Sequence, residues 1–173
     1  MDGDKQNLQA KTAKRINEKL KRIPMKKEAL NWLGELAIIH ATGNDTNGKY
    51  CIVELYATKE GSPPWHVHHR EDEGFYVIDG ELTLYVGDKS YKAKNGDYLL
   101  APKDIPHTYT VDSPGHARIL MICSPTGFED CVRAMSTPAT SLVPPEPENA
   151  ETDFGKIMNI AAEYGVEFVE APV

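Results

Sequence analysis

The sequence predicts an all-β fold, a jelly-roll sandwich or barrel of roughly nine short strands. Three observations support it. Short segments between residues 35 and 124 alternate apolar and polar residues, as strands with one buried face do. Glycine, asparagine, aspartate and proline stand at the joints. No helical period occurs between residues 35 and 124, which disfavours a parallel α/β sheet.

The expected strands follow one another closely along the chain. They cover residues 35–41, 49–58, 65–69, 73–79, 81–86, 89–94, 97–102, 107–111 and 116–124. Asp79-Gly80 is expected to form a tight turn between two of them, and Gly87-Asp88 and Asn95-Gly96 are further turns. The loop TGNDTNG separates the first two strands.

Helical patterns flank the strands. Apolar residues at spacings of three to four predict an N-terminal helix that ends before Pro24: Leu8, Thr12, Ile16, Leu20 and Ile23. After a proline-rich connector, Thr152 or Asp153 can cap a second helix. Its expected docking face holds Phe154, Ile157, Met158, Ala161 and Tyr164. We therefore expect a basic helical arm (1–34), a β-barrel (35–131), and a connector with a C-terminal helix (132–173).

Charge and composition limit the partners. The net charge is −7, but residues 1–30 hold nine basic against four acidic residues, so the rest of the chain carries −12. An acidic barrel is a poor nucleic-acid binder, because phosphate affinity depends on Lys and Arg. The basic arm is interpreted as a solvated helix face. No apolar run approaches the roughly 18 residues of a membrane span.

Three cysteines in no metal or redox spacing, and no secretory signal at the start, predict a reducing, cytoplasmic location.

The segment from Gly61 to Gly80 contains the strongest functional signal. His66 and His68 are one residue apart, so on a strand both imidazoles point to the same face. Glu73 follows after four residues, and His107 opens a later strand. Three neutral imidazoles and one carboxylate inside a barrel form a site for a divalent transition metal.

The roles of some residues stay open at this point. Glu73 is interpreted as a metal ligand, a general base or a structural residue at the bend, with Glu71 and Asp72 as alternative carboxylates. His69 is expected on the surface, and His40 and His116 match no motif. Three residues share the strand parity of Glu73 or His107. The ordinary barrel core is the default interpretation for them, and they are also candidates for the pocket wall: Phe75, Val77 and Tyr109.

Two motifs together resemble the cupin superfamily. The first reads Gly61, four residues, His66-Val67-His68, four residues, Glu73, six residues, Gly80. The second reads Gly96, five residues, Pro102, then His107. Asp104 stands where the family has glycine and Val111 where it has asparagine. Because aspartate tolerates a left-handed turn, we expect the corner at Asp104 to persist.

The resemblance extends over residues 35–128, and within the family it is closest to small single-domain cupins similar to quercetin 2,3-dioxygenases. It implies a double-stranded β-helix, a homodimer and a first-row metal such as iron, manganese, cobalt or nickel. Zinc is a further candidate, because it binds tightly to almost any such ligand set. His66, His68, Glu73 and His107 are the implied ligands.

The expected chemistry follows from an open position on such a metal. A substrate enol or phenol would bind there, Glu73 would take its proton, and the electron-rich anion would react with dioxygen. The resemblance leaves two alternatives open: an oxygen-independent isomerase, decarboxylase or lyase, and a module that binds a small molecule without converting it.

Overall fold

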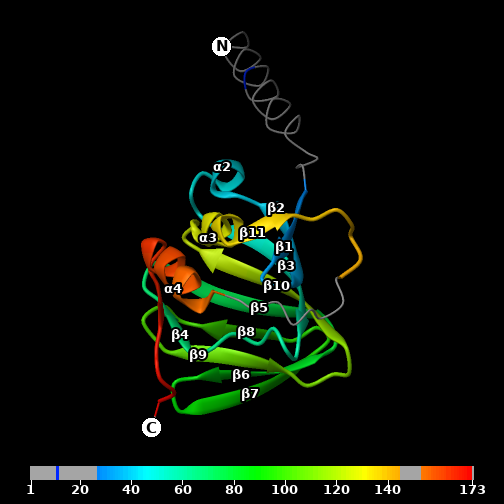
Figure 1. Ribbon diagram of the computed structural model, residues 1–173, viewed down its shortest axis with the longest axis vertical. Helices are drawn as coiled ribbons and strands as arrows, with labels where there is room; N and C mark the ends of the chain where they lie inside the picture. The colour runs from blue at the N-terminus through cyan, green and yellow to red at the C-terminus, as the bar shows by residue number, and fades with distance from the viewer. Residues whose placement is uncertain (1–10, 12–26, 145–152, 173) are drawn as a thin grey trace, which may run out of the picture.

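The computed structural model describes residue 11 and residues 27–144 and 153–172, and these form two antiparallel β-sheets (Figure 1). The seven-stranded sheet has the order β11-β1-β2-β3-β10-β5-β8, and the five-stranded sheet has the order β12-β4-β9-β6-β7. In chain order the strands are β1 (Glu28–Trp32), β2 (Glu35–Ala41), β3 (Cys51–Thr58), β4 (His66–His68), β5 (Asp72–Asp79), β6 (Glu81–Val86), β7 (Lys89–Lys94), β8 (Tyr98–Ala101), β9 (His107–Val111), β10 (His116–Ser124), β11 (Ser136–Pro138) and β12 (Val166–Phe168).

The nine strands predicted from the sequence all form, within one or two residues of the expected bounds. The alternation that predicts them reflects burial on one face. In β10, for example, every second residue from Ala117 to Cys123 is buried. The all-β prediction is therefore confirmed.

The first strand of the sheet lies before the predicted start of the barrel. Residues 28–32 form β1, which pairs with β2 through a two-residue turn at Leu33 and Gly34, both with positive φ. Strand β1 thus lies within the segment expected to be the helical arm, because five half-polar residues are too few to show a clear alternation. Residues 1–10 and 12–26 of the predicted basic arm lie outside the described residues.

Asp79-Gly80 does not close a hairpin. β5 belongs to the seven-stranded sheet and β6 to the five-stranded sheet, so this turn carries the chain from one sheet to the other. Gly80 has a φ of +89°, and a Cβ there would lie 3.0 Å from the Cα of Ala117. The turn signal was interpreted correctly as a reversal, but the local sequence does not show which sheet receives the next strand.

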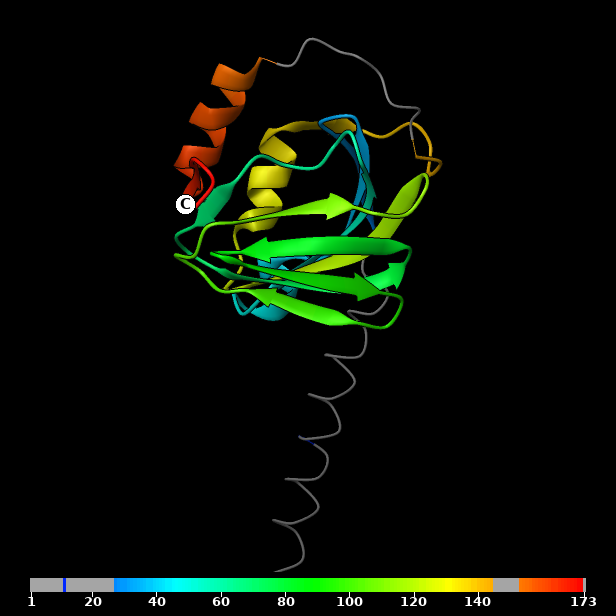
Figure 2. The ribbon, with the colours of Figure 1, turned by 90° about the horizontal axis from the view of Figure 1, so that it is seen from below.

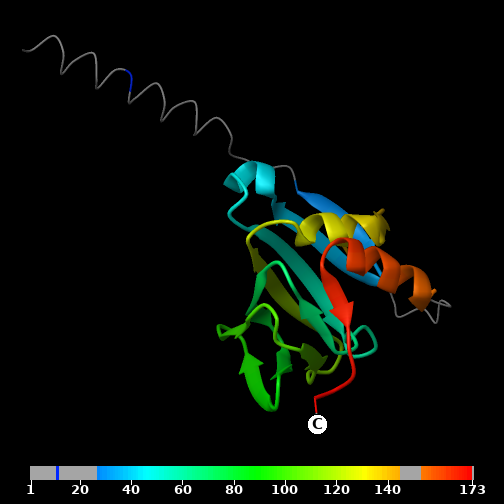
Figure 3. The ribbon, with the colours of Figure 1, turned by 90° about the vertical axis from the view of Figure 1, so that its left-hand side faces the viewer.

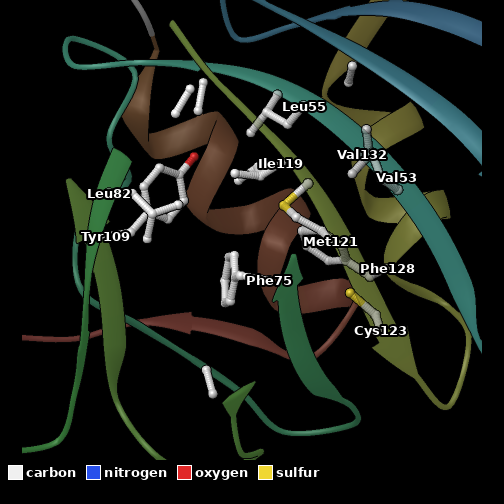
Figure 4. Packing of buried hydrophobic residues seen from close by; sticks show 14 of the residues in the cluster. Val53, Leu55, Phe75, Leu82, Tyr109, Ile119, Met121, Cys123, Phe128 and Val132 are labelled. Carbon is white, nitrogen blue, oxygen red and sulfur yellow. The ribbon is translucent and has the colours of Figure 1, made fainter. Parts of the chain in front are cut away.

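The core fills the space between the sheets (Figure 4). Leu82 and Tyr109 from the five-stranded sheet face Ile119 and Met121 from the seven-stranded sheet, and Phe75 lies between them. All five side chains are buried. A packed barrel of this kind provides rigid strands from which side chains can converge on one point.

Three short helices complete the described part of the chain: α2 (Gly43–Thr46), α3 (Phe128–Ala134) and α4 (Phe154–Glu163). Figures 2 and 3 show α3 and α4 as neighbours on one side of the strands. α2 occupies part of the loop expected between the first two strands. Among the residues that the structure describes, every helix is too short or too polar to span a bilayer.

The C-terminal helix begins where the sequence predicts it, with the Asp153 carboxylate accepting a hydrogen bond from the backbone N–H of Lys156. Its predicted docking face is only partly right. Ile157 and Ala161 are buried, whereas Phe154 and Met158 are exposed. After α4 the chain adds β12 as an edge strand paired with β4, which fixes the helix beside the histidine strand.

Candidate metal centre

Four side chains from three strands meet between the two sheets. His66 and His68 come from β4, His107 from β9, and Glu73 from β5 of the opposite sheet. His66 and His107 are directly paired in register, which brings the two sequence motifs together. All four are buried. One potential ligand atom from each lies within 4.8 Å of the others.

The distances within this cluster are short. The Nε2 of His107 lies 3.1 Å from Oε2 of Glu73, and the Nε2 of His68 lies 3.6 Å from the same oxygen. The rings of His66 and His107 have centroids 4.4 Å apart. Ligands that surround a transition metal at about 2.0–2.2 Å are separated by similar distances.

The second nitrogen of each histidine is held by a hydrogen-bond acceptor. The Nδ1 of His66 donates to the carbonyl of Pro64 (2.8 Å), and the Nδ1 of His107 to the carbonyl of Ile105 (3.1 Å). The Nδ1 of His68 bonds to the Glu71 carboxylate at 2.8 Å. Because a carbonyl can only accept, Nδ1 carries the hydrogen in the first two rings, and their Nε2 atoms face the cluster as potential ligands.

Burial and mutual charge set the protonation states. Burial lowers the pKa of His66 to about 3, and His107 and His68 act in the same direction, so the ring is neutral at pH 7. Burial alone would raise the pKa of Glu73, but the positive charge that the His68 and His107 rings carry when protonated outweighs it and holds the pKa at about 2, so Glu73 is ionised. A carboxylate and a neutral imidazole are the forms that bind metals.

One buried atom lacks the partner that a metal would provide. The Nε2 of His68 has no hydrogen-bond partner among the described residues, although its side chain is 1% exposed. A buried polar atom without a partner costs about 1–3 kcal/mol. The orphaned nitrogen, the three Nδ1 contacts and the donor set of three imidazoles and one carboxylate all fit a divalent transition metal.

The other predicted candidates lie outside the cluster. Glu71 is buried and holds the ring of His68 in place through the contact with its Nδ1. Asp72 is exposed and accepts a hydrogen bond from the backbone of Lys103. His69 lies on the surface, as expected, between Asp104 and Glu167.

Two further histidines also lie elsewhere. His40 bonds to Glu54 at 2.6 Å, and His116 is exposed at the start of β10.

A cavity of about 200 Å³ opens beside the cluster. His66, His68 and Glu73 line one part of it, and Tyr109 lines it as predicted. Phe75 and Val77 do not line the cavity. Both are buried in the core, where Phe75 contacts the rings of His107 and Tyr109.

Much of the cavity wall comes from segments that the sequence motifs do not include. Phe128 of α3 packs its ring 4.9 Å from that of His68. Ile157 and Ala161 of α4 and Phe168 of β12 close another side. The amphipathic pattern of α4 predicts a buried face. Nothing in the local sequence shows that this face covers the cluster of His66, His68, Glu73 and His107.

Comparison with known families identifies the fold. Residues 52–123 match the model of the cupin domain family. The chain is a member of the cupin superfamily. Within this cupin, 79 residues (46% of the chain) are 35% identical to quercetin 2,3-dioxygenase of Bacillus subtilis (strain 168). The matched part spans only 23% of that curated relative.

The chain is also similar to solved structures, over part of its length. An oxalate decarboxylase from Lactobacillus farciminis, in complex with formate, superposes with a TM-score of 0.50 at 12% identity, over 58% of this chain and 31% of that one. An RmlC-like cupin from Shewanella frigidimarina gives a TM-score of 0.49 at 19% identity, over 62% of this chain and 89% of that one.

The two departures from the cupin pattern have simple structural outcomes. Asp104 has a φ of +63°, so the left-handed corner expected there forms with aspartate in place of glycine. Its backbone N–H bonds to the carbonyl of His68, which ties the two motif segments together. Val111 is buried at the end of β9 and belongs to the core. Neither substitution disturbs the cluster.

Proposed function

We propose that this cupin is a metal-dependent dioxygenase that acts on an enolisable or phenolic small molecule of the flavonol type. The observation that carries the proposal is the cluster of His66, His68, Glu73 and His107 at the wall of a largely apolar cavity. The relationship to a quercetin 2,3-dioxygenase supports this reaction over other cupin chemistries.

The four clustered residues would hold the metal. A divalent transition metal bound there would acidify a coordinated enol or phenol and bring it together with dioxygen. Glu73 would take the hydroxyl proton of the substrate on its carboxylate, since it is the only carboxylate in the cluster. Both oxygen atoms of dioxygen would then enter the product as the substrate is cleaved.

The apolar wall would exclude water from the reaction. Met121, Phe128 and Ile157 line the cavity beside the cluster. A substrate anion in such a site meets little water that could compete with dioxygen or return the proton. Cys123, whose thiol lies 3.9 Å from Oε1 of Glu73, stays protonated because burial raises its pKa.

Oxygen-electrode measurements test the proposal. Protein reconstituted separately with iron, manganese, cobalt, nickel or zinc should consume dioxygen when a flavonol is added, with at least one of these metals. Glu73→Gln should abolish the uptake. Glu81→Gln, an exposed carboxylate on β6, is the matched control and should not change it.

The same preparations separate the alternatives. Turnover of the substrate without dioxygen would overturn the dioxygenase proposal in favour of an isomerase, decarboxylase or lyase. Tight binding with no turnover under any condition would favour a module that only binds its ligand.

A further inference from the structure

Three residues that line the same cavity carry polar groups that the four clustered residues do not use. They are Glu35 with its carboxyl group, Trp32 with its indole N–H and Ser62 with its hydroxyl. We propose that they form a second polar subsite that binds a neutral hydroxyl group of the ligand while the metal centre binds its other end. The inference deepens the proposed function and rests on it for the end of the ligand that meets the metal.

The β1–β2 hairpin places two of these groups together. Trp32 and Glu35 are paired in register on either side of the two-residue turn. Paired residues in an antiparallel ladder project from the same face with Cβ atoms about 4.5–5.5 Å apart. Both side chains therefore extend into the cavity that they line.

The subsite contains polar atoms without partners. Trp32 Nε1 and Ser62 Oγ are buried and have no hydrogen-bond partner among the described residues. Since buried donors and acceptors are nearly always paired in folded proteins, two unpaired ones in residues that line one cavity indicate a missing ligand group or water.

Glu35 has one oxygen engaged and one available. Its Oε1 accepts hydrogen bonds from the backbone N–H and the hydroxyl of Thr58. No hydrogen bond to Oε2 occurs within the described part of the chain, and the residue is 6% exposed. Gly61 leaves room for this carboxyl group, since a Cβ there would collide with it.

The subsite and the metal cluster lie at different parts of the cavity. The ring of Phe128 stands between them, 5.9 Å from Trp32 and 4.9 Å from His68. Tyr109 lines the cavity as well. Burial raises its pKa well above the usual value, and the charges of Glu35 and Glu73 act in the same direction.

The chemistry of the three groups selects the ligand. A hydroxyl group can accept a hydrogen bond from the Trp32 N–H and donate its own hydrogen to the free oxygen of Glu35. The Ser62 hydroxyl can either donate a hydrogen bond to the ligand or accept one from it. A ligand carboxylate would be repelled by an ionised Glu35. The ligand class is thus a mainly apolar molecule with a metal-binding oxygen pair at one end and a hydroxyl at the other.

Two flavonols that differ by one group provide the test. 3-Hydroxyflavone has the metal-binding oxygen pair alone, and 3,4′-dihydroxyflavone adds a distal hydroxyl. Binding of both to the full metal-loaded chain is measured without oxygen, so that turnover does not interfere. Above pH 7, where Glu35 is ionised, wild-type protein should prefer the dihydroxy compound roughly tenfold to hundredfold, the range for hydrogen bonds to a charged group.

The variants assign the preference to the subsite. Trp32→Phe keeps an aromatic ring against Phe128 and removes only the N–H, so the ratio of the two affinities should fall toward one. Glu35→Met should do the same by removing the acceptor. Trp65→Phe is the matched control, since Trp65 does not line the cavity and the ratio should stay at the wild-type value.

The outcomes separate this inference from the dioxygenase proposal. Equal affinities in wild-type protein, an unchanged ratio in Trp32→Phe, or failure of both flavonols to bind would overturn the subsite. A clear preference together with no oxygen uptake in air would overturn the dioxygenase proposal and leave the subsite in place.

Discussion

Glu73 and His107 lie on opposite sheets of the barrel, and their side chains meet with Oε2 and Nε2 3.1 Å apart. Both are almost completely buried. Their contact closes the metal cluster across the barrel, because His66 and His68 come from the same sheet as His107 and only Glu73 comes from the other. The geometry of the site therefore depends on how the two sheets pack.

Removing the acceptor behind His68 should weaken metal binding. In Glu71→Ala the Nδ1 of His68 loses its 2.8 Å partner, and the ring is no longer fixed in orientation. Losses of about 10–100-fold in metal affinity follow from removing such partners. Glu71→Gln keeps an acceptor oxygen and should lose less. Competition with a chelator measures both, and equal affinities for wild type and Glu71→Ala would show that Glu71 has no positioning role.

Stability should fall with rising pH because of Glu35. Burial raises its pKa to about 7, against the hydrogen bonds from Thr58, while in the unfolded chain the group has its ordinary value of 4.5. Between these values the unfolded chain loses a proton that the folded protein keeps. The stabilisation is complete below pH 4.5 and is lost as the pH rises to 7, by about 3 kcal/mol.

Comparing wild type with Glu35→Gln isolates this effect, because other titrating groups are common to both proteins. Of the groups around Glu35, Thr58 does not titrate and the pKa of Tyr109 lies well above this window. The difference in unfolding free energy should change steadily between pH 4.5 and 7. Parallel curves across that range would contradict a buried, neutral Glu35.

The two faces of α4 should respond differently to truncation. Ile157 is buried against the cavity, so Ile157→Ala should destabilise the protein by about 2 kcal/mol or more. Met158, next in sequence and exposed, provides the control, and Met158→Ala should cost less than about 0.5 kcal/mol. Chemical denaturation measures the unfolding free energy of both variants. Similar losses of stability in Ile157→Ala and Met158→Ala would mean that α4 does not dock through its Ile157 face.

The corner at Asp104 should tolerate glycine and reject a branched residue. Its φ of +63° lies in the left-handed region, where residues with a Cβ are strained by about 1–2 kcal/mol. Asp104→Gly should therefore keep the stability of the wild type, whereas Asp104→Val should lose at least that amount. Thermal unfolding measures both, and a stable valine variant would count against the strained corner.

The sequence predicted the strands and the shared face of His66 and His68 because both depend on local spacing. Alternation marks a strand wherever one face is buried, and His66 and His68 must share a face at that spacing. Pairing of His66 with His107 depends on the order of strands in the sheet, and only the resemblance to cupins indicated it. The short strands β1, β11 and β12 have too few residues to show a period.

The cavity wall was harder to predict. Three aromatic residues reach it from distant parts of the chain: Trp32 from the first strand, Phe128 from a helix and Phe168 from the last strand. Phe75 was expected there by strand parity, but inward residues of a barrel mostly fill the core. The expected homodimer stays a prediction, which light scattering on purified protein would check.

Elemental analysis of protein purified without chelators tests the central claim most directly. One divalent transition metal per chain is predicted for the wild type, and none for the double variant His66→Ala, His107→Ala, which should keep its β-sheet circular dichroism because the core packs without the metal. A wild-type protein that contains no metal and takes none up, or a double variant that retains it, would contradict the account.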